Sequence, residues 1–282
     1  MKRSEHSSKR HRLLGGEVDA VTPAEVLSFT ARRIEGAQGA IVANHNLHSL
    51  ALMKLNPRMR DFYARADLIE IDSRPLIAWG RLLGRDLGAR HRCTYLDWRD
   101  AFWTMAQDRG WRVFYLGGEP GVAERAAEKI QARSPGLALA THHGYFDHRP
   151  GSAGTARVLQ AIRAFAPDVI FVGMGMPIQE QWIEENQASL RGVIFPVGAA
   201  FDYEAGAQSA CPRWLGRAGL EWLYRFATQP RRLFHRYFVE PWSLAPEALG
   251  DLRDRLIGAE RPRELWRRRG RHAALLARRV LH

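Results

Sequence analysis

The sequence is poor in cysteine and lysine, and it has no long apolar stretch. The 282 residues include two cysteines, Cys93 and Cys211, which excludes a disulfide scaffold and favours a reducing compartment. The longest apolar segments, Val169–Met176 and Val193–Phe201, fall well short of the roughly 20 residues that a membrane-spanning helix needs. No apolar segment follows the basic N-terminus, so we expect no signal peptide. These absences predict a cytoplasmic protein.

The composition that remains is that of a folded globular protein. With 46% hydrophobic and 26% charged residues, the chain is long enough for one large α/β domain or for a domain with an appendage. Intrinsic disorder and collagen-like repeats are excluded at this level.

Positive charge is concentrated near the C-terminus. Residues 211–282 contain 16 Arg, no Lys and 7 acidic residues, so they carry +9 of the total net charge of +12. Such a region predicts an anionic partner: nucleic acid, an anionic membrane surface or a phosphate-rich substrate. A coding bias toward Arg would explain why the chain has only four Lys, but not where its arginines lie.

Between residues 22 and 197, short apolar segments alternate with segments whose apolar residues have helical spacing. We expect helices at Thr22–Glu35, Leu47–Arg65, Pro75–Leu83, Asp97–Arg109, Val122–Arg133, Thr155–Phe165 and Glu180–Leu190, and strands at Ala40–Asn46, Leu68–Ile71, Arg112–Leu116, Ala138–Thr141, Asp168–Val172 and Gly192–Val197. Strands that are apolar on both faces and alternate with helices predict an α/β fold, with a mostly parallel sheet and helices on both faces. We divide the chain into a disordered basic tail (residues 1–16), an α/β domain (17–210) and a basic helical appendage (211–282).

Polar and glycine-rich segments follow the expected strands. They are Asn44–His48, Asp72–Arg74, Gly117–Gly121, His142–Phe146, Gly173–Glu180 and Gly198–Gly206. Ligands of parallel α/β sheets bind beyond the carboxyl ends of the strands. The coincidence predicts an enzyme or a ligand-binding protein.

Three of these segments contain candidate chemistry, each with a simpler alternative. The glycine turn Gly117–Gly121 can hold an anion with backbone N–H groups, but a tight strand-to-helix turn explains it equally well. Asp72 is a candidate general base, although an aspartate at a strand end is more often a helix cap. Asn44, Asn46 and His48 can hydrogen-bond a polyhydroxyl ligand or satisfy the loop backbone.

The remaining segments suggest hydroxyl binding and give little support for a metal. Gln179 and Glu180 can bind ribose, sugar or base, but Glu180 can equally be a first-turn acid that the helix dipole stabilises. His142 and His143 have no third ligand at metal spacing, so we expect a metal-free site. The chain has no GxGxxG, Walker lysine, DxD pair or GxSxG sequence, which argues against the common NAD, ATP and hydrolase sites.

The basic C-terminal quarter interleaves arginine with aromatic residues. In GLEWLYRFATQPRRLFHRYFVEPW, Arg225, Arg232 and Arg236 stand among Trp, Tyr and Phe. Arginine is suited to phosphate, and aromatic side chains are suited to a membrane interface. The alternative is a helical hairpin that packs its aromatic residues on the core.

Several strings, read together, resemble one family. They are ADLIEIDSRP, VFYLGGEPGVAERAA, GYF, PDVIFVGMGMPIQEQWI, VGAAFDYEAG and GLEWLYRF followed by QPRRLFHRY, in this order. Over about residues 20–240 the chain resembles the WecG/TagA/CpsF bacterial glycosyltransferases (glycosyltransferase family 26). The resemblance implies a Rossmann-like fold and an inverting, metal-independent hexosyl transfer, without a cofactor, from a UDP-sugar to a polyprenyl-diphosphate-linked saccharide. Exopolysaccharide or other cell-surface glycan synthesis is the implied context.

The resemblance also implies partners and residue roles. The appendage would face substrate and an anionic membrane surface, peripherally on the inner face of the cell membrane, with no nucleic acid as partner and self-association left open. The catalytic base is implied at Asp72. Substrate contacts are implied at Asn44, Asn46, Arg92, Gln179, Glu180 and Asp202, nucleotide contacts at Gly117, Gly118, Gly173, Gly175 and Gly198, and diphosphate contacts at Arg225, Arg232 and Arg236.

The chain departs from the family pattern at several positions. Asn44 replaces the usual Thr, His48 replaces an acid, Tyr95 replaces a Gly, and Ala210 stands where an arginine is typical. An N-acetylmannosamine donor is therefore not assumed, and a glucosyl donor remains equally open.

Two other classes stay open from the residues alone. A nucleic-acid-binding protein would explain the basic quarter but not the strand-end loops, and it predicts salt-sensitive binding. A nucleotide-dependent oxidoreductase would explain the glycine turns, but the dinucleotide fingerprint is missing.

Overall fold

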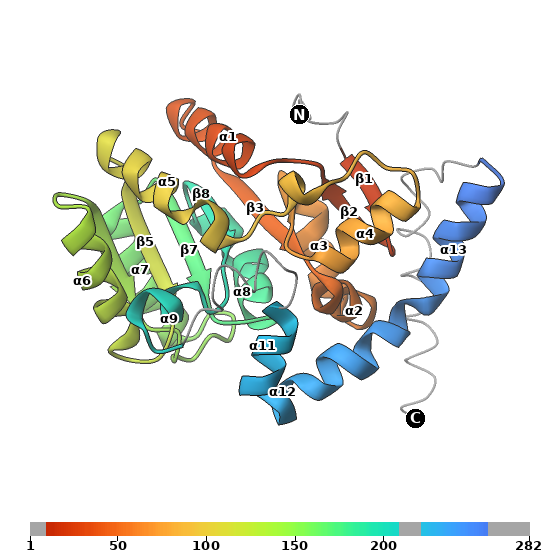
Figure 1. Cartoon of the computed structure of the whole chain (residues 1–282). Helices are drawn as coiled ribbons and strands as arrows, with labels where there is room; N and C mark the ends of the chain where they lie inside the picture. Colours follow the sequence, from red (N-terminus) through yellow and green to blue (C-terminus); the bar gives the residue numbers. More distant parts are fainter. Residues whose placement is uncertain (1–9, 209–220, 259–282) are drawn as a thin grey trace.

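A computed structural model describes residues 10–208 and 221–258, and its centre is one parallel sheet (Figure 1). The six strands are β3 (Ala40–His45), β4 (Leu68–Ile71), β5 (Arg112–Gly117), β6 (Ala138–His142), β7 (Val169–Gly173) and β8 (Val193–Pro196). Their order is β4-β3-β8-β7-β5-β6, and each neighbouring pair is parallel. The predicted α/β fold with a mostly parallel sheet is confirmed.

Helices cover both faces of this sheet because its strands are apolar on both sides. Along β5, Val113 and Tyr115 belong to one buried cluster, and Phe114 and Leu116 belong to another. The first cluster packs against α1 (Pro23–Glu35), α5 (Tyr95–Asp108), α6 (Val122–Arg133) and α9 (Ala200–Ala205). The second packs against α3 (Pro57–Arg65), α7 (Ala153–Phe165) and α8 (Ile178–Asn186).

Most predicted elements agree with the observed ones to within about two residues at each end, but one predicted helix is divided. In place of Leu47–Arg65 the structure has α2 (Leu47–Leu55) and α3, which begins at Pro57. Asn56 caps α3 through Arg58 N (3.1 Å), and Pro57 has no N–H to continue the α2 hydrogen-bond ladder. At α1, Thr22 and Glu25 form a capping box.

A small hairpin corrects the prediction of a disordered tail over residues 1–16. Strands β1 (Arg10–Leu13) and β2 (Gly16–Asp19) are antiparallel, and residues 1–9 lie outside the described part of the chain. Arg10 donates two hydrogen bonds of 2.7 Å to Asp19, and Leu13 is fully buried. The hairpin forms a third apolar cluster with α2 and α4 (Arg74–Leu82).

The described C-terminal residues 221–258, here called the C-terminal segment, are helical. They form α11 (Glu221–Thr228), α12 (Pro230–Phe234), the π-turn η4 (His235–Val239), the 3₁₀ turn η5 (Glu240–Leu244) and α13 (Ala245–Leu256). Leu244 is 3% exposed in the third cluster, so the segment packs against the hairpin side of the domain (Figure 1). The predicted domain boundary at 210/211 lies outside the described residues. Among the helices of the described ranges, none has the length and apolar character that crossing a bilayer requires.

Candidate functional site

The predicted site residues gather at one edge of the sheet, where all six parallel strands end. Contacts join neighbouring strand ends directly at this carboxyl edge. Asn44 Nδ2 donates to the Pro196 carbonyl at 2.9 Å, and Gly118 N donates to the Gly173 carbonyl at 3.2 Å. Asp72 N donates to the His45 carbonyl at 2.9 Å. The strand-end segments therefore form one continuous surface, as predicted.

Asp72 is half-buried at the end of β4. It does not cap the following helix, which was the alternative to a role as general base. The N-cap of α4 is Ser73, whose Oγ accepts from Leu76 N at 3.4 Å. Arg92 lies next to this strand end, because it pairs with Ile71 in an isolated bridge. Arg92 Nη1 also contacts Asp97 Oδ2 at 3.4 Å.

A second carboxyl group lies on the same strand, and the sequence analysis did not single it out. Glu70 is 4% exposed and accepts a hydrogen bond from Trp98 Nε1 at 3.1 Å. Burial, and then the negative charge of Asp72, raise the pKa of Glu70 well above its usual value. Glu70 therefore keeps its proton to a higher pH than an ordinary glutamate does. An acid inside the apolar run LIEI was the available signal.

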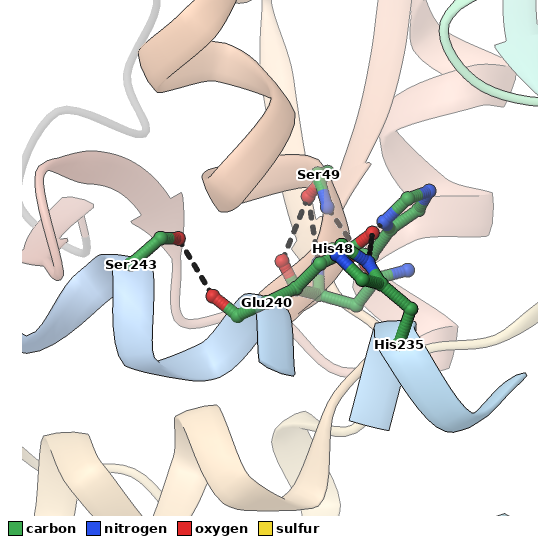
Figure 2. A network of polar contacts seen from close by, with 6 residues as sticks. His48, Ser49, His235, Glu240 and Ser243 are labelled. Atoms are coloured by element: carbon green, nitrogen blue, oxygen red, sulfur yellow. Dashed lines mark hydrogen bonds and ion pairs between the residues drawn. The ribbon is translucent and has the colours of Figure 1, made fainter. Parts of the chain in front are cut away.

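The polar residues after β3 are all engaged by the protein itself. Asn46 caps α2, since its Oδ1 accepts from Ser49 N at 3.0 Å, and this matches the loop-backbone alternative. Asn44 bridges β3 to β8 through the bond to Pro196. His48 Nδ1 contacts Glu240 Oε2 of the C-terminal segment at 2.5 Å, and Figure 2 shows the two side chains directed toward each other.

Arg236 reaches the same neighbourhood. Burial, followed by the positive charge of Arg236, lowers the pKa of His48, while Glu240 acts in the opposite direction. The half-buried Arg236 therefore lies near the start of α2, at the carboxyl edge. Of the three predicted diphosphate arginines, Arg225 and Arg232 have side chains outside the described residues, and only their backbone in α11 and α12 is placed.

The glycines that were predicted to face a nucleotide are explained by close backbone approach or by a positive φ. A Cβ on Gly173 would lie 2.5 Å from the Gly198 carbonyl oxygen, and one on Gly117 would lie 2.4 Å from the Gly173 carbonyl oxygen. Gly118, Gly175 and Gly198 have φ of +69°, +78° and +54°, which an L side chain rarely adopts. These five positions form a compact backbone surface at the ends of β5, β7 and β8.

Gln179 and Glu180 begin α8 and are buried rather than exposed. Gln179 is 1% exposed and Glu180 is 0% exposed. Gln179 Oε1 accepts from Gly175 N at 3.2 Å and from Gly198 N at 3.1 Å, so this side chain joins the turns after β7 and β8. Burial raises the pKa of Glu180 to about 7.

Asp202 lies half-buried in the first turn of α9. After burial, its charge is the second cause that raises the pKa of Tyr115, so the two side chains are close. The Tyr115 hydroxyl is buried beside the glycine turns, 2.6 Å from where a Cβ of Gly173 would be. Tyr115 was not predicted as a site residue, and its burial in a strand gave no sequence signal.

The sequence comparison decides the family to which this chain belongs. The sequence profile of the Glycosyl transferase WecG/TagA/CpsF family matches residues 11–257. The chain belongs to the WecG/TagA/CpsF family. The predicted family and the glycosyltransferase class are thus confirmed.

Relatives of this WecG/TagA/CpsF protein include two proteins of Staphylococcus aureus, from strains MRSA252 and NCTC 8325. Each is named N-acetylglucosaminyldiphosphoundecaprenol N-acetyl-beta-D-mannosaminyltransferase and is 30% identical over 203 residues, which are 68% of this chain and 77% of the relative. Membership in the family favours the glycosyltransferase interpretation over the nucleic-acid-binding and oxidoreductase alternatives.

Metal-binding clusters are not seen in the part of this WecG/TagA/CpsF chain that the structure describes. Within residues 10–208 and 221–258, no three His, Cys, Asp or Glu side chains are grouped to hold an ion. His142 Nδ1 lies 2.7 Å from the carbonyl oxygen of His143.

Proposed function

We propose that this chain is an inverting transferase that moves a sugar from a UDP-sugar to a polyprenyl-diphosphate-linked saccharide, without a metal or a cofactor. The observation that carries the proposal is the position of Asp72, half-buried beside Arg92 at the edge where the glycine turns also converge. The names of the Staphylococcus aureus relatives support a polyprenyl-diphosphate acceptor. Exopolysaccharide or other cell-surface glycan synthesis is the proposed context.

The proposed reaction is a single displacement with Asp72 as general base. Its carboxylate removes the proton from an acceptor hydroxyl while that oxygen attacks the anomeric carbon, and UDP leaves from the opposite face. Because burial and Asp72 favour the protonated form of Glu70, the available base at this strand end is Asp72. Its half-buried position would also limit competition from water.

Stabilisation of the UDP leaving group is proposed to come from fixed dipoles and arginines. α6 begins directly after the glycine turn Gly117–Gly121, so the positive end of its helix dipole lies at this edge. Arg92 and Arg236 supply positive charge at the same edge. Pre-oriented donors and charges in a site that excludes water stabilise developing negative charge strongly.

The geometry also bears on the donor sugar. His48, one of the departures from the family pattern, contacts Glu240. This contact supports a role for His48 in docking the C-terminal segment more than a role in binding the sugar. Asn44 uses its amide nitrogen on Pro196 and keeps its oxygen for another partner. Both N-acetylmannosamine and glucose therefore remain candidate donors.

Peripheral attachment to the inner face of the cell membrane is the second part of the proposal. The C-terminal segment exposes large apolar side chains, at Trp222, Leu223, Phe234, Phe238, Val239, Trp242, Leu249, Leu256 and Ile257. Amphipathic helices with arginine and aromatic residues bind at anionic interfaces. In flotation assays the protein should bind vesicles that contain phosphatidylglycerol and not pure phosphatidylcholine vesicles. Equal binding to both would contradict a role of positive charge in membrane attachment.

The transfer reaction is tested by a donor scan. Purified protein is given a panel of UDP-sugars and a short-chain polyprenyl-diphosphate saccharide, with EDTA present, and UDP release is recorded. Acceptor-dependent release from one donor supports the proposal and identifies the sugar. No UDP release with any donor, together with tight, salt-sensitive binding to nucleic acid, would favour a nucleic-acid-binding protein.

The role of Asp72 is tested with Asp72→Asn against Asp61→Asn, an exposed carboxylate on α3. Loss of a general base should lower kcat by about 10²–10⁴-fold while donor KM changes little. Asp61→Asn should behave like the wild type. Near-normal turnover of Asp72→Asn would show that another group removes the proton.

A further inference from the structure

We propose that Glu180 is a positioning residue, whose carboxylate orients the Gln179 amide so that the Gln179 oxygen fixes the turns after β7 and β8. The inference rests on the proposed function. It assigns to Glu180 an indirect role in place of the direct substrate contact that the sequence suggested.

The first step is the double hydrogen bond made by Gln179. Its Oε1 accepts from the backbone N–H of Gly175 (3.2 Å) and from that of Gly198 (3.1 Å). These glycines belong to the turns after the neighbouring strands β7 and β8. A single side-chain oxygen therefore sets the spacing of two turns that form the proposed nucleotide surface.

The second step is the direction of the Gln179 amide. An amide has one acceptor oxygen and one donor nitrogen, and a flipped amide would place N–H groups against the N–H groups of Gly175 and Gly198. Glu180 Oε1 accepts from Gln179 Nε2 at 2.7 Å. Because a carboxyl group offers an acceptor oxygen whether it is ionised or protonated, Glu180 favours the orientation in which the Gln179 nitrogen faces Glu180 and the Gln179 oxygen faces the turns.

The third step is burial. Since Gln179 is 1% and Glu180 0% exposed, the bond between them is shielded from water, and a lost partner leaves a buried polar group unsatisfied. The second carboxylate oxygen, Oε2, is buried and has no hydrogen-bond partner among the described residues. An acid is an unfavourable choice for stability at this position, which points to a role in the site rather than in folding alone.

The test compares three variants in the UDP-release assay. Glu180→Gln keeps an acceptor oxygen for Gln179 and should keep kcat/KM within about threefold of the wild type. Glu180→Met removes the acceptor and should raise the donor KM by about tenfold or more, with a smaller loss of kcat, because misplaced turns weaken donor binding. Gln179→Met should give the same defect, and the double variant should be no worse than either single one.

Hydrogen exchange gives a readout that does not depend on turnover. Amides of residues 174–178 and 197–200 should exchange faster in Glu180→Met and Gln179→Met than in Glu180→Gln. Glu185→Met, on the same helix and paired with Arg58, is the matched control and should leave these amides unchanged. If wild-type protein lacks transferase activity while the exchange pattern holds, the proposed function fails and the positioning role stands.

Two results would overturn the inference. Glu180→Gln with a loss as large as that of Glu180→Met would show that the charge or proton of Glu180 acts directly. Unchanged exchange at both turns in Glu180→Met and Gln179→Met would show that the pair does not hold them. Should Glu180→Met fail to fold, Gln179→Met and Glu180→Gln still decide between these outcomes.

Discussion

The carboxyl edge of the sheet and the C-terminal segment are held in place by different kinds of contact. At the edge, backbone groups and buried amides make the connections, as in the bond from Gly118 N to the Gly173 carbonyl and the paired bonds of Gln179. The C-terminal segment is docked by charged side chains near the surface. The side chains of His48 and Glu240 are 18% and 20% exposed, and those of Lys54 and Glu247 are each 28% exposed.

This difference separates a fixed region from a displaceable one. The hydrogen bonds at the edge join buried and half-buried groups, so water competes with them less than with the surface ion pairs, and the edge suits the positioning of reacting groups. Ion pairs near the surface contribute about 0–1 kcal/mol each and are screened by salt. The segment also buries Leu244 against the domain, and Asp251 Oδ2 accepts hydrogen bonds from Leu14 N (2.8 Å) and Trp79 Nε1 (3.1 Å). These contacts define where the segment binds.

The largest effect should come from crowding the fixed region. Gly173→Ala would place a Cβ 2.5 Å from the Gly198 carbonyl oxygen and 2.6 Å from the Tyr115 hydroxyl, so backbone must move. Overpacking of this kind costs about 1–3 kcal/mol, or about 3–10 °C in the melting temperature of a domain of this size. Gly88→Ala, where nothing lies within 4 Å and φ is −149°, is the matched control. Calorimetry that finds equal melting temperatures for both variants would contradict the tight fit.

A second effect is the pH dependence that Glu180 gives to the same region. Burial raises its pKa from 4.5 to about 7, so between these values the folded state keeps a proton that the unfolded state releases. The free energy of unfolding therefore falls by about 3 kcal/mol at most as pH rises from about 4.5 to 7. Above pH 7 this contribution no longer changes.

The comparison of wild type with Glu180→Gln isolates this contribution, because other titrating groups, Glu70 included, are common to both proteins. Melting temperatures at pH 5 and pH 8 should differ by several degrees more in the wild type than in the variant. If the melting temperature of Glu180→Gln depended on pH as strongly as that of the wild type, Glu180 would have a pKa near its ordinary value in the folded protein.

Local pattern was enough to predict most of the fold. The helix Val122–Arg133 and the strand Leu68–Ile71 have the predicted bounds, because their periodicity, caps and glycine turns lie within the element itself. The β1–β2 hairpin could not be recognised in this way. Its strands are four residues long and partly charged, and Leu13 is buried by residues that come later in the chain, such as Leu50 and Leu244.

The grouping of the strand-end residues at one edge was predictable from the sequence, and the contacts of the individual side chains were less so. Because parallel strands end at one edge, the strand-end positions could be grouped from the sequence. Whether a polar side chain faces the ligand or the protein depends on packing between distant segments, as His48 shows by its contact with Glu240. For Gln179 and Glu180 a signal existed, since they stand three or four residues before Ile183 and so share the buried face of α8.

The smallest predicted effect concerns the displaceable region and uses the pair Lys54–Glu247, whose atoms lie 2.7 Å apart. Lys54→Glu should place two carboxylates together and weaken the docking of the C-terminal segment, so that trypsin cuts sooner after Arg253 and Arg255 in α13. The double change Lys54→Glu with Glu247→Lys should restore part of the protection, since Lys54 also donates to the Ser243 carbonyl and that bond is not replaced.

Salt distinguishes an ion pair from simple packing in this experiment. The gap between the single and double variants should correspond to about 0.2–1 kcal/mol in low salt and should shrink as ionic strength rises. The pair Arg58–Glu185, which joins α3 to α8, is the matched control, because reversing its charges should leave cleavage in α13 unchanged. Equal cleavage of wild type and Lys54→Glu at low salt would mean that Leu244 and Asp251 hold the segment without help from charge, and the contrast between the two regions would then be one of packing alone.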